Sequence, residues 1–88
     1  MIIFFEKSTG KIKGTIEGRI HSDQDMNMWI GDKDKTDRIV VNWKKDKSRY
    51  IPSLKDNGQK KIFEEIDKDT SLVYKFKVNT KTKKMMKL

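Results

Sequence analysis

Strict alternation of apolar and polar residues near both ends of the chain is the feature that most constrains its fold. Ile12, Ile16 and Ile20 share one side with two glycines, while charged or polar residues occupy the other side. Near the C-terminus, alternate residues are again apolar: Leu72, Tyr74, Phe76 and Val78. A period of two is typical of a β-strand with one buried face. Because a polar turn joins each segment to another short strand, the sequence predicts an N-terminal hairpin at residues 1–20 and a C-terminal hairpin at residues 71–88.

The first hairpin carries three further signals. Residues 2–6 are apolar on both faces, which indicates a central strand or a strand covered on both sides. Gly14 interrupts the second strand, and a glycine inside a strand marks a bulge or a close approach by another group. Gly10 supplies a turn residue that adopts positive φ easily. Lys83 stands at the matching position of the C-terminal hairpin, so that turn is either built differently or strained.

Between the hairpins, the sequence predicts two short helices and two short strands. One helix begins at a good N-cap, Ser22, and ends at Gly31. The other is predicted at residues 59–67, where apolar residues recur at helical spacing after a turn signal. Of the strands, one is predicted at residues 38–44, and the other at residues 50–54 is an edge strand because it contains proline.

Size and composition limit the chain to one small domain. It has 88 residues and no cysteine, so no disulfide supports the fold and a single apolar core must do so. We expect one α+β domain, residues 1–88: a mainly antiparallel sheet of four to six strands with two short helices. The predicted core residues are Ile12, Ile16, Ile39, Val41, Trp43, Phe63, Tyr74 and Phe76. The lack of cysteine favours a cytoplasmic location, and no apolar run has the length needed to cross a membrane.

The sequence offers little for catalysis or metal binding. His21 is the only histidine, and the Ser and Asp directly after it cannot readily converge on it to form a catalytic triad. Residues 32–37 resemble the start of a calcium loop, but Asp37 stands where that loop needs glycine and Trp43 where it needs glutamate. We therefore expect no enzymatic activity, no catalytic residue, no cofactor and no metal.

Positive charge is concentrated at one end of the chain. The net charge is +8, and residues 71–88 contain six lysines and no acidic residue. These lysines are the candidate contacts for an anionic partner: Lys75, Lys77, Lys81, Lys83, Lys84 and Lys87. Two interpretations stay open. The lysines bind an anionic partner, which is a nucleic acid, an acidic protein surface or a phospholipid headgroup, or they form a merely solvated lysine-rich face. Strand alternation would place Tyr74 and Phe76 on one face and Lys75 and Lys77 on the other, so a face that stacks bases would lack its own cations.

Residues 4–12 read Phe-Phe-Glu-Lys-Ser-Thr-Gly-Lys-Ile. This segment resembles the hairpin, with an aromatic, an acid and then Thr-Gly-Lys-Ile, at the start of small structural or assembly proteins of tailed phages. The resemblance covers about twenty residues. It implies a non-enzymatic virion or accessory component and assigns no functional residue.

Two functions are therefore expected of this chain. The first is a non-catalytic binding or assembly module with protein partners, cytoplasmic or in a virion, which acts through surface complementarity and strand addition at an exposed edge. The second is a nucleic-acid-binding protein that uses the basic C-terminal hairpin. Neither function involves a membrane.

Overall fold

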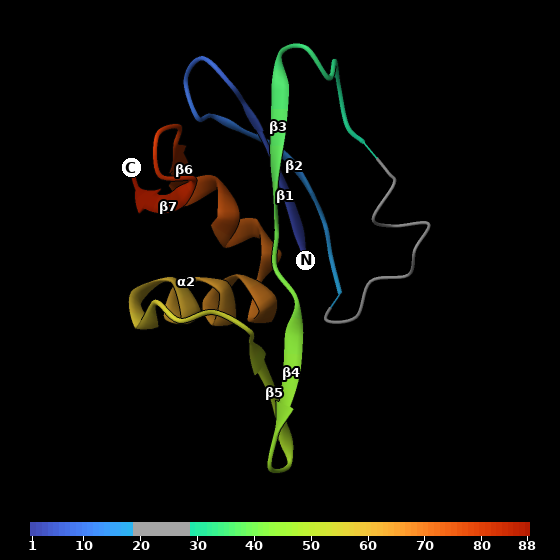
Figure 1. Ribbon diagram of the computed structural model, residues 1–88, viewed down its shortest axis with the longest axis vertical. Coiled ribbons are helices and arrows are strands. Elements are labelled where there is room, and N and C mark those ends of the chain that lie inside the picture. The colour runs from blue at the N-terminus through green and yellow to red at the C-terminus, as the bar shows by residue number, and fades with distance from the viewer. Residues whose placement is uncertain (19–28) are drawn as a thin grey trace.

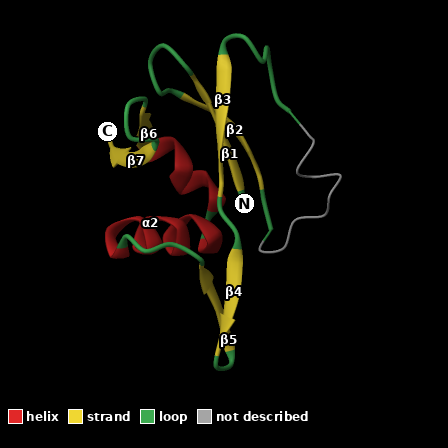
Figure 2. Cartoon of the chain, in the orientation of Figure 1, coloured by secondary structure: helices red, strands yellow, loops and turns green. Residues whose placement is uncertain are grey.

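The computed structural model describes residues 1–18 and 29–88. Within these ranges, the chain forms short strands, one α-helix and one 3₁₀-helix (Figures 1 and 2). They are β1 (Ile2–Glu6), β2 (Ile12–Ile16), β3 (Thr36–Val40), β4 (Trp43–Asp46), β5 (Arg49–Pro52), α2 (Asn57–Lys68), η1 (Thr70–Lys75), β6 (Phe76–Asn79) and β7 (Lys84–Lys87). The strands pair antiparallel in three sheets, ordered β2-β1-β3, β4-β5 and β6-β7. The α+β class and both terminal hairpins are confirmed, with the strands divided among three small sheets.

The central strand β1 is buried on both faces, as predicted. A bulge between Phe4 and Phe5 shifts its register with β2, so that Phe5 lies opposite Ile12 while Ile2 lies opposite Ile16. Directly opposite residues point to the same face of a sheet. Ile12 and Ile16 therefore lie on opposite faces, and the prediction that they share one face is wrong because of the bulge. The bulge lies beside Gly14, in agreement with the interpretation of that glycine.

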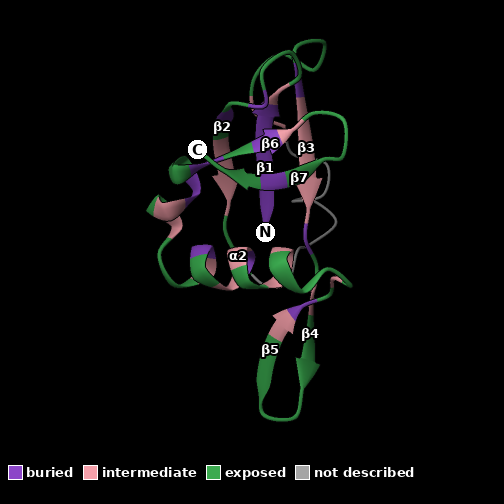
Figure 3. Cartoon of the chain, turned by 90° about the vertical axis from the view of Figure 1, so that its left-hand side faces the viewer, coloured by how far each residue is buried: buried purple, intermediate pink, exposed green. Residues whose placement is uncertain are grey.

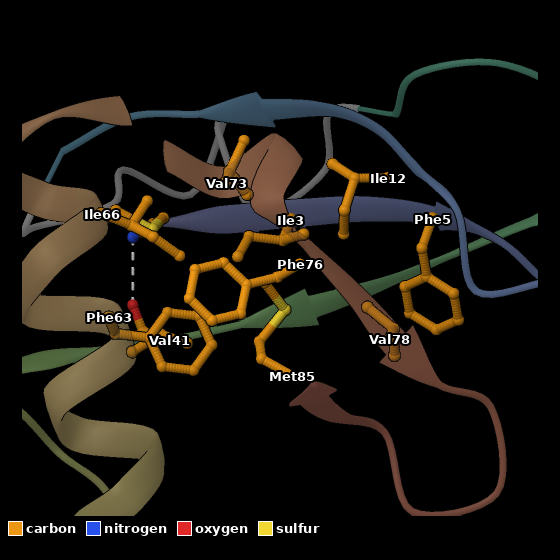
Figure 4. Close-up of a cluster of buried hydrophobic side chains, with 11 residues drawn as sticks. Ile3, Phe5, Ile12, Val41, Phe63, Ile66, Val73, Phe76, Val78 and Met85 are labelled. Carbon is orange, nitrogen blue, oxygen red and sulfur yellow. Dashed lines mark hydrogen bonds between the residues drawn. The ribbon is translucent and has the colours of Figure 1, made fainter. Parts of the chain in front are cut away.

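One face of this sheet carries the main core (Figures 3 and 4). The β6-β7 hairpin and helix α2 lie side by side over this face, with 3₁₀-helix η1 at one end. The buried cluster joins side chains from all these elements: Ile3, Phe5, Ile12, Val41, Phe63, Ile66, Val73, Phe76, Val78 and Met85. Because each element contributes only one to three of these side chains, the core forms only when the two terminal hairpins and the helix come together.

The second face of the sheet is covered by Trp29. Phe4 is fully buried there, and its ring meets the Trp29 ring edge-on at 5.9 Å between centroids. The Trp29 indole N–H donates to the Thr36 hydroxyl at 2.8 Å, and the Arg38 guanidinium lies 4.9 Å from the ring centre. These contacts fix the tryptophan over β1. The helix predicted from Ser22 lies outside the described residues, except for its last part.

Helix α2 matches its prediction closely. Asp56 caps it, accepting a hydrogen bond from the Gln59 backbone N–H at 3.2 Å. Phe63 and Ile66 point into the core, one turn apart. Gln59 also reaches the outer edge of β7, where its side-chain amide donates to the Met85 carbonyl oxygen at 3.0 Å and accepts from the Met85 N–H at 2.9 Å. In residues 1–18 and 29–88, no helix is both long enough and apolar enough to span a membrane.

The strand predicted at residues 38–44 is two strands. The Val41 N–H still donates to Met1 in line with the β1-β3 ladder, at 2.8 Å, but the next carbonyl, of Asn42, accepts from Ser53 at 2.8 Å. The chain thus changes its pairing partner from β1 to β5 at this point, and the β4-β5 hairpin projects from the body (Figure 1). Trp43, predicted to be a core residue, is partly buried and lies at the base of this hairpin. The predicted edge strand is confirmed as β5.

The amine of Met1 is held inside this junction. It donates to the carbonyl oxygens of Gly18 at 2.7 Å and Val41 at 3.0 Å. Burial lowers the pKa of this amine to about 6, against the opposing effect of the Asp67 carboxylate. The neutral amine keeps two N–H groups, which is enough for both carbonyl oxygens.

The predicted long strand from residue 72 begins only at Phe76. Asp69 accepts hydrogen bonds from the Ser71 N–H at 3.1 Å and the Ser71 hydroxyl at 2.6 Å, and this cap starts the 3₁₀-helix η1. Helical geometry turns Val73 into the core and Tyr74 out to solvent. The prediction that Tyr74 is buried is therefore wrong: 58% of the residue is exposed.

The two hairpin turns have the same construction. The Gly10 N–H donates to Glu6 at 2.8 Å, and the Lys83 N–H donates to Asn79 at 2.7 Å. Gly10 has a φ of 78° and Lys83 a φ of 55°. Of the two alternatives for the second turn, the strained one is thus correct, since a non-glycine residue in this region costs about 1–2 kcal/mol.

The turns differ in their surroundings. The Gly10 carbonyl accepts from the Val78 N–H at 2.8 Å, and a Cβ on Gly10 would overlap the Val78 carbonyl oxygen. The first turn is therefore packed directly against the outer edge of β6, and this contact positions the candidate site.

Candidate functional site

The six predicted lysines are all exposed, but the structure divides them into groups. Lys83 lies 2.9 Å from a carboxylate oxygen of Asp37, on β3, and Lys84 lies 2.9 Å from one of Asp56, the cap of α2. Each lysine hydrogen-bonds its carboxylate and holds the pKa of that carboxyl group below its usual value. Lys83 and Lys84 therefore each form an exposed ion pair with a residue outside the C-terminal hairpin.

Lys77 and Lys81 lie along a different surface, which they share with Lys11 of the first hairpin. Two adjoining hollows, of about 300 and 320 Å³, have Thr9 and Lys77 in common. Lys11 lines the first hollow and Lys81 the second. We call the two hollows together the basic groove. No acidic side chain lines it within the described chain, and none of its three lysines forms an ion pair with a described residue.

Tyr74 lines the same hollow as Lys11 and Lys77. The strand interpretation placed this ring and the lysines on opposite faces, and that geometry is wrong because the strand starts after Tyr74. Ile12 and Phe76 also line this hollow, and both are largely buried. The first hollow therefore combines an apolar floor, an exposed aromatic ring and two ammonium groups.

The two remaining predicted lysines, Lys75 and Lys87, line neither hollow. The sequence missed Lys11, because its place in the site depends on the packing of the first turn against β6. No local pattern points to Lys11, since the contact of Gly10 with Val78 is visible only in the structure. The site therefore consists of two of the six predicted lysines, one from the other hairpin, and Tyr74.

A larger hollow, of about 660 Å³, lies between the first turn and the segment before β3. Two of its three carboxylates are engaged locally: Glu6 accepts from the Ser8 hydroxyl at 3.0 Å and pairs with Lys13 at 3.2 Å, and Asp32 accepts from the Asp34 N–H at 2.8 Å. Among residues 1–18 and 29–88, no three His, Asp or Glu side chains come together to hold a metal ion. His21 lies outside these ranges.

Comparison of the chain with models of protein families, with curated proteins and with solved structures finds no match. Its function is therefore argued from the geometry of the basic groove.

Proposed function

We propose that the protein is a non-catalytic nucleic-acid-binding module and that the basic groove is its contact surface. One observation carries this proposal: Lys11, Lys77 and Lys81, from two hairpins distant in the sequence, gather along one groove that no acidic side chain lines in the described chain. Clustered ammonium groups raise the local positive potential and attract a phosphate backbone.

The ion pairs refine the proposal. Lys83 and Lys84 would have to leave Asp37 and Asp56 before they could bind phosphate, so they contribute less than the free lysines. Six phosphate contacts would give a log–log salt slope of about −5 on duplex DNA. Three contacts give a slope of about −3 on a duplex and about −2 on a single strand. The slope therefore reports how many lysines take part.

An assembly module with a protein partner is the second candidate. Met86 and Leu88, which line the second and first hollows, are 39% and 77% exposed, and exposed apolar residues favour protein contacts. Part of the segment that resembles phage assembly proteins makes a contact within the fold, because Gly10 in this segment packs against β6. Strand addition at β7 is opposed by Gln59, whose side chain occupies both backbone groups of Met85.

The experiment is fluorescence anisotropy with labelled oligonucleotides, both single strands and duplexes, over a range of salt concentrations. The test variant is Lys77→Glu/Lys81→Glu, and the matched control is Lys44→Glu/Lys45→Glu, which makes the same charge change on exposed lysines of β4. We expect binding tighter than about 10⁻⁴ M at near-physiological salt, with a slope close to −2 or −3. The test variant should reduce the magnitude of the slope to about 1 or less, and the control should leave the slope nearly unchanged.

Two results would overturn the proposal. The first is binding no tighter than about 10⁻⁴ M, the weak limit of non-specific affinity. The second is an equal loss in the test and control variants, which would assign binding to net charge alone. Sedimentation of the free protein then tests the second candidate, since a self-assembling module should form oligomers.

A further inference from the structure

We infer that the ligand of the basic groove is a single strand, with one base stacked on the ring of Tyr74. This inference rests on the proposed function and specifies its substrate class.

Tyr74 is the residue that carries the inference. More than half of Tyr74 is exposed, although Val73 just before it and Phe76 two residues after it are buried. Its side chain lines the first hollow, and no hydrogen bond to another described residue holds it. An exposed tyrosine offers a rigid π-face at low cost in conformational entropy, and nucleic-acid bases stack well on such faces.

The chemistry of the first hollow matches a nucleotide better than a phosphate alone. Its floor is formed by Ile12 and Phe76, and its rim carries Thr9, Lys11 and Lys77. A base can lie on the apolar floor beside Tyr74 while its phosphate meets a lysine at the rim. Its volume of about 300 Å³ lies at the lower end of the range for small organic ligands.

The second hollow indicates that the ligand is a chain. It continues from Thr9 and Lys77 toward Lys81, so a strand with a base at Tyr74 can place a later phosphate near Lys81. In a duplex, bases are stacked on each other and unavailable to a side chain on a surface, whereas single strands can splay their bases out. The groove therefore favours a single strand over a duplex of the same sequence.

The test compares a single strand with the matching duplex at near-physiological salt, using Tyr74→Ala, Tyr74→Leu and Tyr74→Phe. Loss of one stacked base weakens binding about 5- to 150-fold, so we expect that loss for Tyr74→Ala on the single strand and almost none on the duplex. Tyr74→Leu keeps apolar bulk without a π-face and should resemble Tyr74→Ala. Tyr74→Phe keeps the ring and should bind within a few-fold of the unchanged chain.

The control is Tyr50→Ala, which removes another exposed tyrosine, on β5 and away from the groove. It should leave single-strand binding unchanged. A length series provides a second measurement: affinity should level off at about four to six nucleotides, the short end of the range for single-strand-binding domains. Circular dichroism of each variant checks that the fold is kept.

The failure of this inference is distinguishable from that of the proposed function. If Tyr74→Ala changes nothing while Lys77→Glu/Lys81→Glu abolishes binding, the groove binds phosphates without stacking, and this inference is wrong. Equal affinity for single strand and duplex, or an equal loss with Tyr50→Ala, also overturns it. If no oligonucleotide binds, both proposals fall together.

Discussion

Gly10→Ala is the substitution that best tests how the site is assembled. Gly10 is needed for two reasons: its φ of 78° lies in the left-handed region, and a Cβ would overlap the Val78 carbonyl oxygen. Alanine pays about 1–2 kcal/mol for that conformation. The turn must also move away from β6 and give up the 2.8 Å hydrogen bond from the Val78 N–H, which is buried. An unsatisfied buried N–H costs about 1–3 kcal/mol.

Reduced freedom of the unfolded chain offsets about 0.5–1 kcal/mol of these costs, so the expected loss is about 1–4.5 kcal/mol. A domain of this length is stable by only about 4–13 kcal/mol, which makes the loss easy to measure. The assay is urea denaturation followed by far-ultraviolet circular dichroism and tryptophan fluorescence, with an unchanged m-value.

Gly58→Ala is the matched control, because Gly58 lies in the first turn of α2 and has no positive φ. A Cβ on Gly58 would have one close neighbour, the end of the Asp56 side chain at 3.3 Å. It should change the free energy of unfolding by less than about 1 kcal/mol in either direction. Equal effects of the two substitutions would refute the reasoning, since they would show that the contact with β6 contributes nothing.

Three further outcomes are expected. In urea denaturation, Phe63→Ala in the core should destabilise the protein by about 3–5 kcal/mol, and Tyr74→Ala by less than about 1 kcal/mol. Similar losses for the two variants would contradict the difference in burial between Phe63 and Tyr74. Gln59→Leu should cost about 1–3 kcal/mol, because both backbone groups of Met85 lose their partner, and an unchanged urea midpoint would count against that bond pair. The Met1 amine has a folded-state pKa of about 6, below its unfolded value, so the unfolded chain binds more protons between pH 6 and pH 8 and stability rises with pH. Thermal unfolding should show a gain in stability of about 1 kcal/mol over this range, after discounting for partial exposure of the amine. A loss of stability over the same range would disprove this prediction.

Elements with local signals were predictable from the sequence. Helix α2 was predicted within two residues at each end, since its Asp56 cap and the spacing of Phe63 and Ile66 act over one or two turns. Both terminal hairpins were predicted for the same reason, from their period of two and their polar turns. The strain at Lys83 was one of the two alternatives predicted for the second turn, because Lys83 stands at the position that matches Gly10.

The errors arose where a local alternative competed with the period of two. One inserted residue in β2 moves Ile12 and Ile16 to opposite faces, and alternation alone does not reveal where a bulge falls. Residues 70–75 alternate like a strand, yet the Asp69 cap starts a helical turn that places Val73 in the core. An Asp before Thr-Ser is a recognisable cap signal, and it favours a helical turn at this point of the chain.

The sequence could not predict which lysines form ion pairs and which line the groove, because this depends on contacts between distant elements. Asp37 and Asp56 engage Lys83 and Lys84 only after β3 and α2 have packed beside the hairpin. Six lysines in one segment therefore do not form one surface, and a charge count overestimates the number of lysines on any one surface.

The same ion pairs help to explain how the groove is presented. In the β6-β7 register, Asn79 lies opposite Lys84 and Val78 lies opposite Met85, with Val78 and Met85 in the core. The core holds one face of this hairpin, Lys83 and Lys84 fasten its turn to β3 and α2, and the first hairpin packs on its outer edge through Gly10. Lys77 and Lys81 are left on a surface whose position three separate contacts determine. A preorganised surface loses little entropy on binding, so its few lysines and one ring can bind more tightly than the same residues on a flexible tail.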